Sequence, residues 1–205
     1  MKGIFIAFEG PDGCGKSTVA ASIYEVLKDK YDVIRTREPG GTEISEKIRD
    51  LILDKDNKDM SARAEALLYA ASRAQHVEEK IKPALKEGKI VLCERFVISS
   101  IVYQGYGRGL DVEDIKEINN FATAGLKPDI TFLFTTGEKL TYRRKLGEDA
   151  DRIEMSGLDF HMRVKRGYEE LSKKNEYTLI DASMPKEDVL NSCLDILYEK
   201  LEVKR

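Results

Sequence analysis

The sequence predicts an α/β protein built on a doubly wound, five-stranded parallel sheet flanked by helices. Five short apolar runs, each of a length typical of a buried strand, alternate with segments whose apolar residues recur at helical spacing. The polar motifs of the chain follow the ends of these runs. Because parallel strands end at one edge of a sheet, we expect ligands to bind beyond that edge.

The first apolar run, residues 4–8, ends in a complete G-x-x-x-x-G-K-[ST] motif. Its glycines allow successive backbone N–H groups to turn towards an anion, and the helix predicted from about Ser17 directs its positive end to the same place. In this motif Lys16 reaches the β/γ-phosphates and Ser17 ligates Mg²⁺. The sequence therefore predicts nucleoside triphosphate binding, as in P-loop proteins. The expected binding residues are Gly10, Pro11, Asp12, Gly13, Cys14, Gly15, Lys16, Ser17 and Thr18.

Length and composition bound the remaining possibilities. A chain of 205 residues with 41% apolar content can bury one substantial core, so we expect a single domain over residues 1–205. A net charge of −3 argues against nucleic-acid binding, which usually requires a basic surface. A small-molecule substrate fits this charge better.

The cysteine and histidine pattern predicts a reducing compartment and no structural metal. Cys14, Cys93 and Cys193 are scattered, without a C-x-x-C pair. The two histidines, His76 and His161, stand alone on helical stretches, and we expect them to be solvated surface groups. No signal peptide or membrane-spanning run is evident, so we expect a cytoplasmic protein with no membrane partner.

The rest of the chain continues the alternation of strands and helices. Pro83 should end or bend the long helix expected over residues 61–86. Residues 99–109 mix aromatic, amide and glycine residues, which is typical of a pocket wall. Residues 146–157 lack apolar periodicity and are expected to be mobile, as part of a lid at about 143–157. The other expected strands are 31–37, 89–93, 130–134 and 177–181, and the other expected helices are 17–30, 44–52, 111–124, 158–174, 186–202 and one from 138.

The sequence favours a kinase over other classes of triphosphate-binding protein. A guanine-specific switch needs an N-K-x-D motif at a strand end, whereas Asn57-Lys58 lacks the aspartate and lies in a polar loop. A motor or ligase usually needs partner domains. A nucleoside monophosphate kinase needs only the loop, an acceptor pocket and a lid. The open alternatives are another monophosphate or deoxynucleoside kinase and an acceptor-independent ATPase.

Six motifs follow one another along the chain: FEGPDGCGKST from residue 8, REPGGT from residue 37, LLYAASRAQ from residue 67, ERF from residue 94, SSxxYQG from residue 99 and DRIE from residue 151. In this order they resemble the motifs of the thymidylate kinase family, whose members phosphorylate dTMP with ATP. The resemblance also implies a homodimer formed through helices away from the site. The helix around Leu67, Leu68 and Ala71 is one candidate for that contact, although these residues may equally belong to an ordinary core.

The resemblance implies roles in phosphoryl transfer. Arg95, with Arg37 or Arg49, would hold the acceptor phosphate, while Ser17 and Glu94 would hold Mg²⁺. Glu94 stands where the family usually has Asp, so its carboxylate lies farther from the backbone. Gly13 stands where some members have a catalytic arginine, and members without it carry basic residues in the lid. The implied catalytic residues are Lys16, Glu94, Arg95, Arg143, Arg144 and Arg152.

The resemblance also implies how the acceptor is read. Tyr69 would stack on the pyrimidine, and Arg73, four residues later on the same helix face, would donate to its 4-oxo group. Ser100 would lie near N3, and Tyr103 would crowd the 2′ position. The alternative for both tyrosines is an ordinary core role. Asp12 either accepts from the acceptor's 3′-hydroxyl or only braces the loop through Arg95. The implied substrate-binding set is Asp12, Arg37, Arg49, Tyr69, Arg73, Arg95, Ser100, Tyr103 and Gln104.

Overall fold

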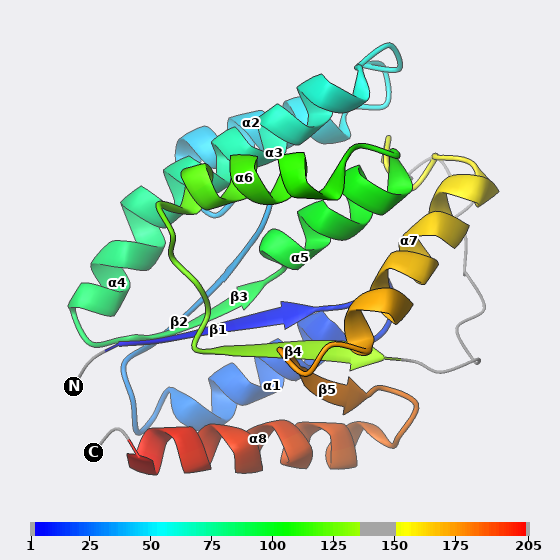
Figure 1. The fold of residues 1–205 in the computed structure, drawn as a ribbon. Helices are drawn as coiled ribbons and strands as arrows, with labels where there is room; N and C mark the ends of the chain where they lie inside the picture. Colours follow the sequence, from blue (N-terminus) through cyan, green and yellow to red (C-terminus); the bar gives the residue numbers. More distant parts are fainter. Residues whose placement is uncertain (1–2, 136–150, 204–205) are drawn as a thin grey trace.

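A computed structural model describes residues 3–135 and 151–203 of the chain. A central sheet lies between two layers of helices (Figure 1). All strand pairs are parallel, and the strand order is β2-β3-β1-β4-β5. The doubly wound α/β fold predicted from the sequence is confirmed. The strands are β1 (Ile4–Glu9), β2 (Val33–Arg37), β3 (Ile90–Glu94), β4 (Ile130–Thr135) and β5 (Thr178–Asp181).

Strand β1 is central because it can be buried on both faces. Ile6 pairs with residues of both neighbouring strands, Leu92 in β3 and Ile130 in β4. Successive side chains of a strand point to opposite faces. Accordingly, Phe8 packs in the core below the sheet, and Phe5 packs in the core above it. The continuous apolar run is therefore a consequence of having a helical layer on each side.

The helices form two layers. Helices α1 (Lys16–Leu27) and α8 (Lys186–Val203) cover one face of the sheet, where their apolar residues share a core with β1 (Figure 1). The other face carries α2 (Glu43–Leu53), α3 (Ala62–His76), α4 (Lys82–Lys86), α5 (Val97–Ser100) and α6 (Val112–Thr123). Helix α7 (Leu158–Ser172) packs against a π-helical segment, η2 (Ile101–Gly107).

The long helix predicted over residues 61–86 is three consecutive helical segments. Helix α3 passes into a π-helical turn, η1 (Val77–Ile81), and then into α4. The Lys82 N–H bonds to Val77 O, five residues earlier, and Pro83 follows in the first turn of α4, where no backbone N–H is required. The helix therefore does not end at Pro83.

The segment expected to form a pocket wall, residues 99–109, is largely helical. Residues 97–107 form α5 and η2, and the chain then turns into α6, whose N-cap is Asp111 as expected. Aromatic and glycine residues obscured the helical pattern, because this segment packs on several sides at once. The helix predicted from residue 138 and residues 143–150 of the predicted lid lie outside the described residues. Every helix within 3–135 and 151–203 is too short or too polar to cross a membrane.

Candidate functional site

The phosphate-binding loop joins β1 to α1 at the carboxyl edge of the sheet (Figure 1). Gly10 has φ 142°, and a Cβ there would lie 2.8 Å from Phe134 O in β4. Gly15, with φ 91°, is the N-cap of α1. Both positions favour glycine because φ is positive, and at Gly10 the backbone also approaches β4 closely.

Lys16 is buried at the start of α1, with its ammonium inside the loop. Its Nζ donates to Pro11 O at 2.6 Å and contacts Cys14 Sγ at 3.6 Å. Burial lowers the pKa of Lys16, and the positive charge of Arg95 lowers it further. An anion bound in the loop would offset both effects, so the loop is built to receive negative charge.

Two cavities meet at the sheet edge. One, of about 370 Å³, is lined by Asp12, Ser17, Glu38, Pro39, Arg49, Leu53, Tyr69, Arg73, Arg95, Ser99, Tyr103, Gln104, Asp151, Ile153 and Glu154. The other, of about 410 Å³, is lined by Asp12, Gly13, Gly15, Lys16, Ser17, Thr18, Arg37, Glu38, Arg49, Glu94 and Arg95. They share five residues, Asp12, Ser17, Glu38, Arg49 and Arg95. Two ligands can therefore meet in adjoining spaces; we refer to them as the acceptor cavity and the loop cavity.

Arg95 stands at the junction of the two cavities. It has a left-handed backbone, φ 65°, which is uncommon for a non-glycine residue and is typical of functional sites. Its guanidinium forms an ion pair with Asp12 and donates to Ser99 Oγ at 3.0 Å. Asp12 also accepts a hydrogen bond from Tyr103 Oη at 2.6 Å. Burial opposes its charge, but Asp12 and neighbouring tyrosines raise the pKa of Arg95 well above its usual value. Arg95 is thus a fixed cation, and Asp12 braces it.

Arg73 is held in the wall of the acceptor cavity by four groups. Its Nε donates to Glu38 Oε2 at 2.6 Å, and its Nη2 donates to Phe96 O at 2.9 Å. Its Nη1 donates to Ser100 Oγ at 2.8 Å and to Asn119 Oδ1. A guanidinium has five N–H groups. Within the described part of the chain, one Nη2 N–H is left for a ligand.

Three further predicted residues contact the cavities in different ways. The Nη1 groups of Arg37 and Arg49 both donate to Pro39 O, at 3.0 and 2.9 Å, and both arginines line the loop cavity. Only Arg49 also lines the acceptor cavity. The Oε1 of Glu94 lies 3.6 Å from Arg35 Nε, and its side chain borders the loop cavity together with Ser17. The site therefore has oxygen ligands of the kind that Mg²⁺ prefers.

The aromatic and amide residues expected in the acceptor cavity line it. Tyr69 and Tyr103 do so, and burial raises the pKa of both hydroxyls, which therefore stay neutral. Gln104 donates through Nε2 to Glu65 Oε1 at 3.0 Å. Its Oε1 is buried and has no hydrogen-bond partner among the described residues. Such an orphaned acceptor is the feature expected of a group that awaits a ligand. Ser100, in contrast, is not part of the cavity lining and contacts Arg73 instead.

Arg152, predicted to cover the donor phosphates, is placed elsewhere. Its Nη2 lies 2.8 Å from Glu65 Oε2, and its Nε donates to Ile52 O at 2.7 Å. The same carboxylate binds Arg108 Nη2 at 2.9 Å. A buried carboxylate is a stronger partner for a guanidinium than water, so Arg152 anchors residues 151–157 to α3 in this arrangement. Arg143 and Arg144 lie outside the described residues.

Several residues of the site were not found from the sequence. His76 was expected on the surface, but this expectation is wrong because the imidazole is fully buried and bonded to Glu38 and Thr36. Its spacing of three from Arg73 on one helix was an available signal. Asn119, 46 residues from Arg73, has no local signal in the sequence.

A third cavity, of about 200 Å³, continues from the phosphate-binding loop towards α8. It is bordered by Gly15 and Thr18 on one side and by Ala182, Met184 and Leu190 on the other. Its position, next to the loop and away from the acceptor cavity, suits the remainder of a nucleotide whose phosphates lie in the loop.

Comparison with known proteins agrees with these features. The family model described as thymidylate kinase matches residues 8–193. The thymidylate kinase of Finegoldia magna is 54% identical over 200 residues, covering 96% of this chain and 98% of the relative. That of Lactobacillus helveticus is 47% identical over 209 residues, covering 98% of each chain. The crystal structure of thymidylate kinase from Ehrlichia chaffeensis is 32% identical and superposes with a TM-score of 0.77, covering 97% of this chain and 99% of that one.

The contacts of Glu65 lead to a stability prediction. Glu65→Gln removes the charge that pairs with Arg108 and Arg152, which leaves buried cations uncompensated and should lower the free energy of unfolding by about 3–5 kcal/mol. Urea unfolding measures the change. The control is Glu78→Gln, which breaks the exposed pair with Lys82 and should cost less than about 1 kcal/mol. Equal losses in the two variants would contradict the anchoring role of Glu65.

Proposed function

Because this chain belongs to the thymidylate kinase family, we propose that it transfers the γ-phosphoryl group of ATP to dTMP, giving dTDP and ADP. The observation that carries the proposal is the pair of adjoining cavities that share Arg95 and Ser17. One has the loop and lysine that suit a triphosphate, and the other has hydrogen-bonding groups that suit a base. A nucleotide in each would bring its phosphates to the same place.

The donor phosphates bind in the loop cavity. Backbone N–H groups of the loop and Lys16 neutralise the β- and γ-oxygens. Ser17 and Glu94 would hold Mg²⁺, Glu94 through water, and the ion would neutralise charge on the transferred group. The adenine would occupy the third cavity, between Thr18 and Leu190.

Transfer depends on alignment, because phosphoryl transfer leaves a protein little covalent chemistry to perform. Arg95 and Arg49, which border both cavities, hold the acceptor phosphate beside the γ-phosphate, and Arg37 supports them from the loop side. Arg143 and Arg144 would cover the donor phosphates; this role rests on the family resemblance. Residues 143–157 would act as the lid of a single domain that excludes water.

The base is read by stacking and by two hydrogen bonds. Tyr69 stacks on the pyrimidine, and the remaining N–H of Arg73 donates to the 4-oxo group. Gln104 Oε1 accepts from N3–H, which supplies the missing partner of that atom. Tyr103 crowds the 2′ position of the sugar. Cytosine offers an amine to Arg73 and an unprotonated N3 to Gln104, so both contacts would be mismatched.

We assign a homodimer formed through the helical layer of α3 and α6, which pack together and expose Leu67 and Phe121. The exposed side chains of Leu67 and Phe121, at 56% and 88%, would form the apolar part of this contact. The three cysteines are free thiols, as suits a cytoplasmic enzyme.

The first test is product formation with a panel of acceptors. ADP should form only when a monophosphate is added, and kcat/KM should be highest for dTMP among dTMP, dUMP, UMP, dCMP and dGMP. Arg73→Ala should lower the dTMP/dCMP ratio of kcat/KM by roughly tenfold or more, because a charge-assisted hydrogen bond to the 4-oxo group is lost. Arg63→Ala, an exposed change on the same helix, is the control. Acceptor-independent hydrolysis, or dCMP equal to dTMP, would refute the proposed function.

A second test separates two roles for Asp12. If Asp12 accepts from the acceptor's 3′-hydroxyl, Asp12→Ala should reduce kcat/KM for dTMP roughly tenfold more than for 3′-deoxy-dTMP. Steady-state kinetics with both acceptors measure this difference. Equal losses would leave Asp12 with the bracing of Arg95 and Tyr103 only.

A third test concerns assembly. Light scattering after size exclusion should give the mass of a dimer for the unaltered protein and of a monomer for Leu67→Glu, since a charge would be buried in the contact. Val26→Glu, at an exposed apolar position of α1, should remain dimeric. A monomeric unaltered protein would exclude the homodimer.

A further inference from the structure

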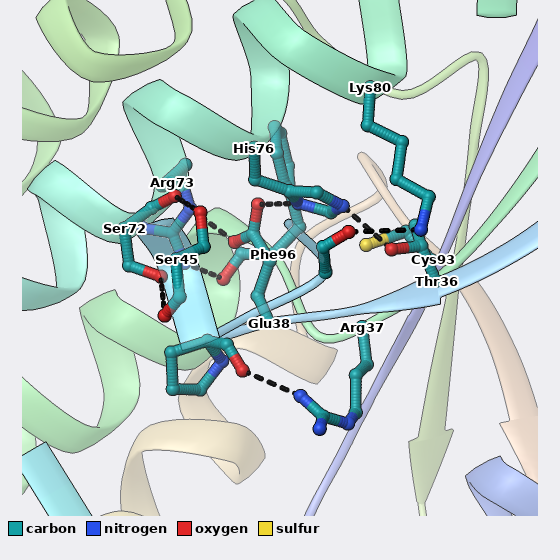
Figure 2. A network of polar contacts seen from close by, with 12 residues as sticks. Thr36, Arg37, Glu38, Ser45, Ser72, Arg73, His76, Lys80, Cys93 and Phe96 are labelled. Atoms are coloured by element: carbon teal, nitrogen blue, oxygen red, sulfur yellow. Dashed lines mark hydrogen bonds and ion pairs between the residues drawn. The ribbon is translucent and has the colours of Figure 1, made fainter. Parts of the chain in front are cut away.

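Behind the acceptor cavity lies a buried chain of hydrogen bonds that runs from β2 to Arg73. Thr36 Oγ1 lies 2.7 Å from His76 Nε2, and His76 Nδ1 lies 3.0 Å from Glu38 Oε1. The second oxygen of Glu38 accepts from Arg73 Nε at 2.6 Å. Figure 2 shows Glu38 between His76 and Arg73. None of these four side chains is more than 6% exposed.

We propose that His76 is a positioning residue for acceptor recognition: its Nδ1–H orients Glu38, which in turn aims Arg73 at the base. This inference rests on the proposed function of Arg73. His76 does not touch the cavity and acts only through Glu38.

The hydrogen bonds define which nitrogen carries the proton. The Glu38 carboxylate, paired with a guanidinium, can only accept, so Nδ1 is the donor. In a neutral imidazole Nε2 is then the acceptor, and the Thr36 hydroxyl donates to it. Thr36 thereby selects the tautomer that serves Glu38. Nearby Cys93 takes no part in the chain: burial raises the pKa of its thiol, which donates to Arg95 O at 3.2 Å.

The geometry of Arg73 makes it sensitive to Glu38. Four of its N–H groups are committed to Glu38, Ser100, Asn119 and Phe96 O, and its guanidinium lies 5.4 Å from the centre of the Phe96 ring. The direction of the fifth N–H is therefore set by the plane of the guanidinium group. Loss of the bond from His76 would leave Glu38 Oε1 buried without a partner among the described residues, and the carboxylate would turn to regain one. Rotation of Glu38 would turn the guanidinium with it.

The imidazole itself has little room to adjust. A Cβ added at Gly41 would lie 2.6 Å from His76 Cδ2 and Nε2, and 2.7 Å from Thr36 Oγ1. The ring is thus confined between the backbone at Gly41 and strand β2. This confinement keeps Nδ1 directed at Glu38 whether or not a ligand is bound.

Matched substitutions at His76 test the inference. The Asn amide nitrogen is as many bonds from Cα as Nδ1, so His76→Asn should keep the contact with Glu38 and a dTMP/dCMP ratio of kcat/KM within about threefold of the unaltered enzyme. The Gln amide nitrogen matches Nε2 instead. His76→Gln and His76→Leu should lower the ratio roughly tenfold, mainly through a higher KM for dTMP.

Melting temperatures of the same variants separate positioning from general stability. A lower Tm with an unchanged dTMP/dCMP ratio in His76→Gln and His76→Leu would overturn the proposal, and so would equal ratios in the Asn and Gln variants. The unaltered enzyme reports on the proposed function separately. If the unaltered enzyme does not prefer dTMP to dCMP, the proposed function is refuted. If it does prefer dTMP and the His76 variants have the same dTMP/dCMP ratio, only the role of His76 is refuted.

A measurement on the unaltered protein covers the case of variants that do not fold. Imidazole ¹⁵N NMR should show His76 protonated at Nδ1 and bare at Nε2. The chain has two histidines, so a His161→Gln variant assigns the signals. A proton on Nε2 with Nδ1 bare would overturn the proposal, because Nδ1 could not then donate to Glu38.

Discussion

Two arginines of the acceptor cavity, Arg73 and Arg95, are each held by a carboxylate from another part of the chain, and the rest of the site depends on these pairs. Arg95 is paired with Asp12, and Arg73 with Glu38. A buried guanidinium without a counter-charge would be strongly destabilising, and neighbouring guanidiniums would repel one another. The carboxylates remove both difficulties. They also fix the orientation of each guanidinium before a ligand binds, so that little reorganisation is required on binding.

The pairs connect segments that are far apart in sequence. Asp12 belongs to the loop after β1, and Arg95 follows β3, so their ion pair joins two strand ends across the top of the sheet. Glu65 of α3 binds Arg152, which precedes α7. The cavity walls are therefore tied to the phosphate-binding loop and to each other by charge. A change at one wall is expected to be felt at the other.

Helix α3 brings several residues of the site together because of its own periodicity. Glu65, Tyr69, Arg73 and His76 are spaced by four, four and three residues, so they share one face of the helix. That face is covered by the loop after β2 and by α6, which supply Glu38 and Asn119. Among the described residues, Glu65, Arg73 and His76 of this face are hydrogen-bonded, and beside them one N–H of Arg73 and the Oε1 of Gln104 in η2 are without a partner.

The sequence by itself determined the order of strands and helices, the phosphate-binding loop and the placement of its motifs at one sheet edge. These follow from local rules: apolar periodicity, glycine in left-handed turns and the parallel arrangement of alternating elements. Only the tertiary structure decided the partners of those motifs. The burial of His76, the contact of Ser100 with Arg73, and the pairing of Arg152 with Glu65 join residues many positions apart. The spacing of His76 from Arg73 indicates a shared helix face, but local spacing does not specify partners on other elements, because these depend on how α3, α6 and the loop after β2 pack together.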